Sequence, residues 1–147
     1  MTYEEYFGNH TELVYRNVGV SMLPMLKQGR DIFVLKKKTS ERCKKYDVVL
    51  YYRKTGQYVL HRIVEVHEKE YVLLGDNCEN KEYGIKEDDI LAVMDSFVRK
   101  GKTILTSDWK YQMYIHIWYW IYPLRKQIFR GKRKMGRIKR VLQKTKK

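Results

Sequence analysis

The chain has 147 residues, an apolar content of 44%, an aromatic content of 14% and a formal net charge of +14. A single domain of this length can bury a hydrophobic core, and this apolar content excludes an intrinsically disordered chain. Thirteen tyrosines beside a single alanine favour strands over a helical bundle.

The positive charge is concentrated towards the C-terminus. Residues 123–147 contain twelve Lys or Arg and no Asp or Glu, and subtracting these twelve cations leaves +2 for residues 1–122. Such a block of like charges is typical of a segment that binds a polyanion or an anionic membrane, or of a solvated extension. The basicity therefore belongs to a tail and not to the body of the protein.

The N-terminal residues and the cysteines favour a cytoplasmic protein. The start, MTYEEYFGNH, is acidic and polar, which predicts no signal peptide. No window contains the ~20 apolar residues that a membrane span requires. The two cysteines, Cys43 and Cys78, provide no disulfide framework and do not require an oxidising compartment.

The first predicted element is a short helix within residues 2–16, followed by strands. From Asn17 onwards the chain consists of short β-branched and aromatic runs with polar breaks. RKTGQ (53–57) and HEKE (67–70) predict the turns of two hairpins. The predicted strands are Asp31–Lys36, Tyr46–Arg53, Gln57–His67, Tyr71–Gly75, Ile90–Arg99 and Lys102–Leu105.

The pattern changes again after Thr106. SDWKYQMYIHIWYWIYP begins with a Ser or Asp N-cap and is apolar nearly all round until Pro123. In the basic stretch that follows, apolar residues are too sparse for a core helix, and Gly131 and Gly136 interrupt it. We therefore expect a mostly β, antiparallel domain with terminal helices over residues 1–106. An aromatic helix and a basic amphipathic tail follow over residues 107–147.

Within the β region lie the parts of an acyl-transfer site. Ser21 directly precedes the first predicted strand, and His61 shares an apolar strand face with Val59 and Ile63. In such a site the histidine takes the serine proton, and an acid orients the imidazole and stabilises its charged form. By spacing alone, the histidine fits a hydrogen-bonded core residue better and the serine fits a turn. Carboxylates follow a strand in LLGDNCENKEYG, at Asp76, Glu79 and Glu82.

Four blocks in order resemble the type I signal peptidases and their Ser–Lys repressor-protease relatives. These blocks are SMLP, GRDIFVL, the strand VLHRIVEV and GDN, and the resemblance covers about residues 18–102. It implies a signal-peptidase-like antiparallel β-sheet or barrel. His61 stands where most bacterial members carry a lysine, which resembles the archaeal and endoplasmic-reticulum branch.

The resemblance implies Ser21 as nucleophile and His61 as general base. The histidine branch has its aspartate six residues after the GDN aspartate, where this chain has Glu82; Asp76 matches the GDN aspartate itself. Both acids stay candidates. Some relatives carry an oxyanion-hole hydroxyl where this chain has Gly19, so backbone N–H groups would stabilise the oxyanion.

The residues around the serine are candidates for substrate contact. Glycine would let the backbone approach a peptide closely, and Pro24 excludes helix and orients Ser21. The resemblance places this region against lipid and the small side chains of a substrate, whereas each residue singly also fits an ordinary core. The candidate substrate-binding residues are Gly19, Met22, Leu23 and Pro24.

The C-terminal region predicts a membrane contact. YQMYIHIWYWIY (111–122) is too short to span a bilayer, but Trp and Tyr favour the headgroup level and the cations that follow favour an anionic leaflet. We expect a monotopic anchor on the inner face of the membrane. The alternatives are an aromatic helix packed on the sheet with a solvated tail, or nucleic-acid binding, which the nearly neutral body disfavours.

The leading hypothesis is a serine endopeptidase that cleaves signal- or leader-type peptides or preproteins through an acyl-enzyme. A non-catalytic protease-fold module that binds peptide or anionic membrane is the alternative. A self-cleaving repressor-type protease fits poorly, because no DNA-binding domain precedes the serine and position 61 is not lysine. The scattered histidines and cysteines predict no metal site, and no phosphate-binding loop or other cofactor motif is present.

Overall fold

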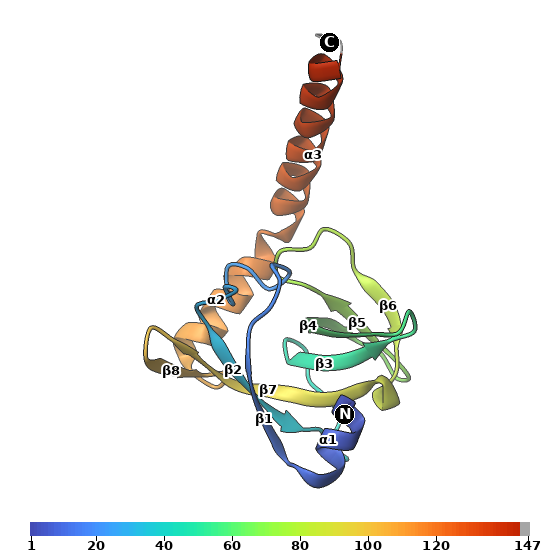
Figure 1. Ribbon diagram of the computed structural model, residues 1–147, viewed down its shortest axis with the longest axis vertical. Helices are drawn as coiled ribbons and strands as arrows, with labels where there is room; N and C mark the ends of the chain where they lie inside the picture. Colours follow the sequence, from blue (N-terminus) through green and yellow to red (C-terminus); the bar gives the residue numbers. More distant parts are fainter. Residues whose placement is uncertain (145–147) are drawn as a thin grey trace. The chain divides into compact units, whose positions relative to one another are not determined.

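The computed structural model describes residues 1–144, apart from the side chains of residue 139 and residues 141–144. Residues 145–147, which end the predicted basic tail, lie outside the described residues. The chain divides into two compact units, Met1–Tyr111 and Gln112–Lys147, and each is described by itself (Figure 1). As predicted, the fold is mostly antiparallel β-sheet with helices at both ends.

One antiparallel sheet of eight strands forms the first unit (Figure 1). Its order is β1-β2-β7-β3-β4-β5-β6, and β8 pairs with β7. Both predicted hairpins are confirmed, because β3 pairs with β4 and β4 with β5, each antiparallel. The strands are β1 (Glu12–Arg16), β2 (Ile32–Lys37), β3 (Val48–Arg53), β4 (Gln57–Val66), β5 (Tyr71–Leu74), β6 (Glu82–Ile85), β7 (Ile90–Arg99) and β8 (Lys102–Leu105).

The N-terminal segment differs from the prediction. A helix, α1 (Tyr3–Asn9), begins with a capping box in which Thr2 and Glu5 exchange side-chain to backbone hydrogen bonds. The helix ends there, and β1 takes up the second half of the segment predicted as helical. β1 pairs with β2, with Leu13 opposite Leu35. This long-range pairing satisfies the backbone of β1, and it overrides the weak helical periodicity.

The sequence pattern did not predict β6 either. It is a four-residue strand at the edge of the sheet, and among the described residues it pairs with β5 alone. Gly84 adopts a φ of +73° inside it, which side-chain-bearing residues rarely adopt. Its charged, glycine-containing sequence lacks the alternation of apolar and polar residues that predicts a strand. A short 3-10 helix, Glu87–Asp89, then leads into β7.

One core cluster lies on the sheet face that also carries His61. Because side chains alternate between faces along a strand, its members on β3 and on β5 are two residues apart, and Ile63 of β4 lies on the same face. Val59 packs against the edge of this cluster. The cluster comprises Cys43, Val49, Tyr51, Ile63, Tyr71, Leu73, Ile85 and Ile90.

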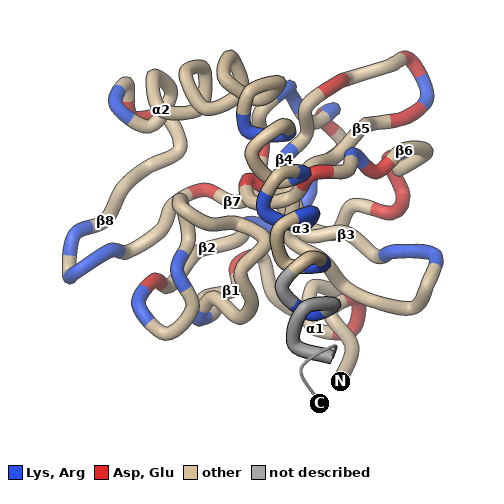
Figure 2. Tube along the Cα trace, turned by 90° about the horizontal axis from the view of Figure 1, so that it is seen from above, with Lys and Arg blue, Asp and Glu red and all other residues tan. Residues whose placement is uncertain are grey.

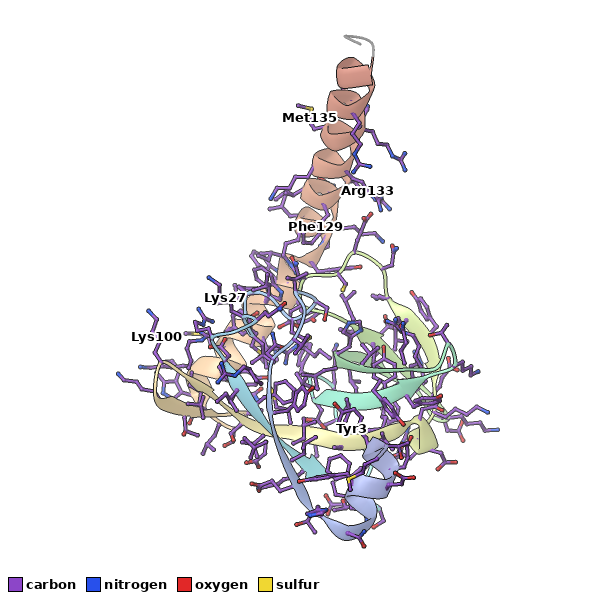
Figure 3. The ribbon with its side chains drawn as sticks, in the orientation of Figure 1. Tyr3, Lys27, Lys100, Phe129, Arg133 and Met135 are labelled. Atoms are coloured by element: carbon purple, nitrogen blue, oxygen red, sulfur yellow. The ribbon has the colours of Figure 1, made fainter. Side chains whose placement is uncertain are left out.

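Helices α2 (Trp109–Trp120) and α3 (Tyr122–Lys144) follow the sheet. Pro123 lies in the first turn of α3, a helix position at which proline is common. The predicted interruption at Gly131 and Gly136 is wrong, because α3 continues through both glycines. Figure 3 shows Arg133 and Met135 projecting from different sides of this helix.

Candidate active site

Ser21 lies in the long loop between β1 and β2. The Asn17 N–H donates a hydrogen bond to the Asp31 carbonyl at 3.0 Å and so closes the base of the loop. Asp31 is fully buried and accepts hydrogen bonds from the Lys27 N–H and the Arg30 guanidinium. The loop that carries Ser21 is therefore held by its own polar contacts.

The four predicted substrate-contact residues differ in exposure. Met22 is only 2% exposed, so its side chain belongs to the core and offers little surface to a peptide. Pro24 is exposed, and Gly19 and Leu23 are half-buried. Gly19 has a φ of +89° and open space where a side chain would begin. These three residues, and not Met22, present surface beside Ser21.

The loop contacts the GDN segment through main-chain hydrogen bonds. The Asn77 N–H donates to the Ser21 carbonyl at 2.7 Å, and Asn77 Nδ2 donates to the Val20 carbonyl at 3.1 Å. A side-chain carbon built on Gly75 would lie 2.8 Å from the Ser21 carbonyl oxygen and 2.9 Å from His61 Nε2. The Ser21 backbone and the imidazole thus both flank Gly75, and only glycine leaves room for them.

His61 is held between two partners. It lies on β4 and is 4% exposed. Its Nδ1 is 3.1 Å from Glu82 Oε1, while its Nε2 is 4.0 Å from Cys78 Sγ. With the Nδ1 proton directed at the carboxylate, Nε2 is the nitrogen that is available to accept a proton.

Two side chains from β3 hold Glu82 in place. Tyr51 Oη donates to Glu82 Oε2 at 2.8 Å and lies 3.4 Å from His61 Nδ1. The Arg53 guanidinium binds both carboxylate oxygens, with Nε 2.9 Å from Oε2. Glu82 is therefore a fixed hydrogen-bond acceptor for the imidazole.

These contacts shift the pKa values of both groups. Burial would raise the pKa of Glu82, but hydrogen bonds from His61, Arg53 and Tyr51 outweigh it and lower the pKa to about 2. Burial would lower the pKa of His61, but its contacts with Cys78 and Glu82 outweigh it and leave the pKa above the ordinary value. Glu82 therefore stays ionised near neutral pH and favours the protonated imidazole.

The other candidate acid, Asp76, faces a different partner. It pairs with Arg62 through two hydrogen bonds of 2.9 Å, and both side chains are fully buried. Arg62 also donates to Tyr111 Oη and to the Tyr46 carbonyl at 3.0 Å. This pair ties the GDN segment, which follows β5, to β4. The third carboxylate, Glu79, is half-buried.

The Ser21 hydroxyl is not held by the imidazole in this structure. Among the residues that the structure describes, it forms no hydrogen bond with His61. Catalytic hydrogen bonds are often long or absent before substrate binds. The arrangement supplies a hydroxyl, a buried base whose Nε2 faces the Cys78 thiol, and a fixed carboxylate, which together can support acyl transfer.

Sequence analysis missed Tyr51, Arg53 and Cys78. A signal for the first two exists in the RKTGQ hairpin, whose register sets Arg53 opposite Gln57 and Val49 opposite His61. Tyr51 and Arg53 then share the face of His61. Cys78 follows the GDN block directly, but nothing local shows that its thiol faces the imidazole.

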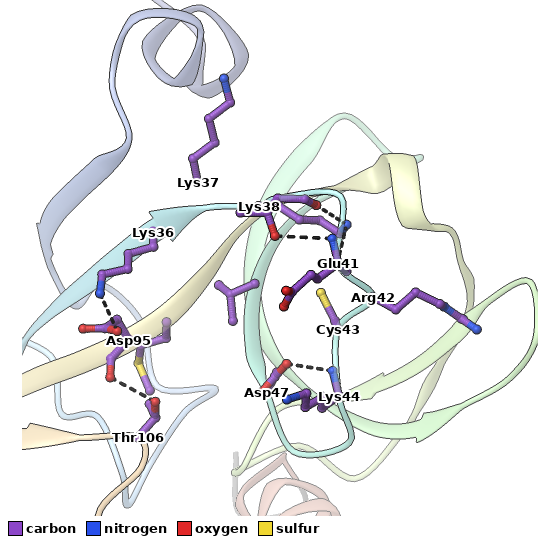
Figure 4. A pocket seen from close by; sticks show the side chains of 13 residues that line it. Lys36, Lys37, Lys38, Glu41, Arg42, Cys43, Lys44, Asp47, Asp95 and Thr106 are labelled. Carbon is purple, nitrogen blue, oxygen red and sulfur yellow. Dashed lines mark hydrogen bonds and ion pairs between the residues drawn. The ribbon is translucent and has the colours of Figure 1, made fainter.

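Features outside this cluster do not extend the site. The pocket in Figure 4 is lined by residues from the segments 36–39, 41–44 and 93–95 and by Asp47 and Thr106, and includes none of the predicted site residues. Within residues 1–144, no three His, Cys, Asp or Glu side chains are grouped so that they could hold a metal ion. In the same part of the chain, no helix is long and apolar enough to cross a membrane.

Comparison of the chain with protein-family models, with curated proteins and with solved structures found no match.

Proposed function

We propose that this protein is a serine endopeptidase of the signal-peptidase type that cleaves signal- or leader-type peptides. The observation that carries the proposal is the joint position of Ser21 and His61 around Gly75, with Glu82 on the far side of the imidazole. Three of the four sequence blocks that resemble the signal peptidases, SMLP, VLHRIVEV and GDN, meet around Gly75. The antiparallel sheet is compatible with a signal-peptidase-like fold.

In the proposed reaction, Ser21 Oγ attacks the scissile carbonyl carbon while His61 Nε2 takes the hydroxyl proton. Glu82 stabilises the resulting imidazolium through Nδ1. The imidazolium then protonates the leaving amine, and an acyl-enzyme ester remains on Ser21. Water, activated by His61, hydrolyses the ester and restores the serine.

The oxyanion of this reaction needs hydrogen-bond donors. The Ser21 N–H donates to no acceptor among the residues that the structure describes, so it is available for this role. A single such donor contributes about 2.7–4 kcal/mol to transition-state stabilisation in serine peptidases. Gly19, with open space around its Cα, leaves room for the peptide backbone to approach this N–H.

The test is cleavage of candidate signal and leader peptides, followed by intact-mass spectrometry. Wild-type protein and a Ser40→Ala control, which removes an exposed serine, should both cut at one bond. Ser21→Ala should lose cleavage while keeping the circular-dichroism spectrum of the wild type. Cleavage that persists in Ser21→Ala would overturn the proposal.

A non-catalytic peptide-binding module is the second candidate. The missing hydrogen bond between the Ser21 hydroxyl and His61 favours it. In that case, calorimetry would detect peptide binding that Ser21→Ala leaves unchanged, and no product would form. Cleavage by the wild type alone would exclude this candidate.

A further inference from the structure

A stripe of exposed apolar side chains runs along the second unit. Its members recur every three or four residues, or every seven where Gly131 intervenes, which places them on one side of a helix. Their side chains are 46–82% exposed. The stripe comprises Ile117, Trp120, Leu124, Ile128, Met135 and Ile138.

The stripe is continuous across the junction between α2 and α3. The Ile121 N–H donates to the Ile117 carbonyl at 3.1 Å, and the Arg125 N–H donates to the Ile121 carbonyl at 3.0 Å. These are i to i−4 helical hydrogen bonds, so the helical spacing holds through the junction. The apolar stripe therefore extends well beyond the aromatic segment 111–122.

The charged side chains of α3 are all cationic. Residues 112–144 contain ten Lys or Arg and no Asp or Glu. Figure 2 shows Lys and Arg, and no acidic residue, along α3. Arg125 is an exception among these cations, because it is buried against the ring of Trp118, 4.0 Å from the ring centroid.

We propose that the second unit is a membrane-surface helix whose apolar stripe inserts into the headgroup boundary of an anionic bilayer. A helix with an apolar stripe, a lysine- and arginine-rich polar face and low overall hydropathy lies in the plane of the interface. Trp120, the most exposed member at 82%, has the side chain that headgroup regions favour. This inference does not depend on the proposed peptidase activity.

The same surface fits the other occupants less well. A nucleic acid would neutralise the cations but would leave the apolar stripe in water. A second copy of the chain would cover the stripe, but the ten cations of each copy would repel those of the other, because residues 112–144 contain no acidic side chain to separate them. An anionic bilayer can bury the apolar stripe and neutralise the cations.

The test is co-sedimentation of the full chain with vesicles of phosphatidylcholine and phosphatidylserine at 7:3, and with pure phosphatidylcholine vesicles. The wild type should bind the mixed vesicles and bind the neutral ones at least about tenfold more weakly. Leu124→Gln with Ile128→Gln should reduce binding to the mixed vesicles about tenfold, because two inserted side chains are lost.

The matched control is Tyr52→Gln with Val66→Gln, which replaces two exposed apolar residues on the sheet. This variant should bind mixed vesicles like the wild type. Equal binding by the stripe variant and the wild type would overturn the proposal, as would binding to duplex DNA with no binding to either vesicle. Concentration-dependent dimerisation of the wild type that Leu124→Gln with Ile128→Gln abolishes, without vesicle binding, would also overturn it.

Discussion

Glu82 reaches His61 across an intervening strand. Glu82 lies on β6 and His61 on β4, with β5 between them, yet Oε1 is 3.1 Å from Nδ1. Arg53 and Tyr51, both on β3, hold the Glu82 carboxylate in this position through hydrogen bonds. The proposed base is thus oriented by a residue that is distant in both sequence and sheet order.

The pH dependence of peptide cleavage should depend on the contact between His61 and Glu82. The general base must be neutral to accept a proton, and the pKa of His61 lies above its ordinary value of 6.5. We therefore expect kcat/KM to increase with pH, with a midpoint above pH 6.5. Glu82→Gln removes a group that raises this pKa, so the midpoint should move to lower pH as the maximal rate falls. His67→Gln, at an exposed histidine that pairs with Glu65, is the control and should change neither. An unshifted midpoint in Glu82→Gln would contradict the assignment.

Stability in acid should depend on the same carboxylate. The pKa of Glu82 falls from 4.5 to about 2 on folding, so its contribution is fully present above pH 4.5 and is lost as pH falls towards 2. Glu82→Gln should therefore lose less stability than the wild type between these pH values. Urea unfolding at pH 5 and at pH 3 measures the difference, and parallel pH dependences would contradict the lowered pKa.

Gly75→Ala should damage the site without unfolding the sheet. The added carbon would lie 2.6 Å from Cys78 Sγ, 2.8 Å from the Ser21 carbonyl oxygen and 2.9 Å from His61 Nε2. The sulfur can move, but the Ser21 backbone must shift, so we expect cleavage to fall at least about a hundredfold, the scale of a 1 Å misplacement. Gly8→Ala, which meets nothing within 4 Å, is the matched control. Wild-type rates in Gly75→Ala would show that Ser21 and His61 need not be close.

The buried Arg62–Asp76 pair should determine stability. Replacing Asp76 by Ala leaves a fully buried guanidinium without its carboxylate, and such losses cost about 3–5 kcal/mol of unfolding free energy. Lys36→Ala breaks a more exposed ion pair with Asp95 (Figure 4), which should cost about 0.2–1 kcal/mol. Urea denaturation measures both. Similar losses in the two variants would show that Asp76 is not needed to neutralise Arg62.

Thiol modification should distinguish the two cysteines. Cys43 is buried, and burial raises the pKa of its thiol to about 11, whereas Cys78 is half-buried beside His61. Iodoacetamide should therefore alkylate Cys78 first, as peptide mapping by mass spectrometry would show. The added group would lie beside His61 Nε2 and should stop cleavage, while Cys78→Ser should resist the reagent. Faster alkylation of Cys43 would contradict the described packing.

Local chemistry explains what the sequence predicted correctly. The turn residues of RKTGQ and HEKE, together with alternating side chains, specify two hairpins. The N-terminal helix ends early and β6 was missed, because each outcome depends on pairing with a strand distant in the chain: β1 with β2, and β6 with β5. Edge strands with charged residues and glycine carry little local signal.

The sequence by itself determined the mostly β architecture, the position of His61 on a buried strand face and the cationic C-terminal helix, because periodicity and charge are local properties. It left both Glu82 and Asp76 as candidates for the acid. Only the tertiary structure decided that Glu82 contacts the imidazole while Asp76 pairs with Arg62. The reason is physical: the reach of a side chain across a sheet depends on strand order, and strand order is set by long-range pairing.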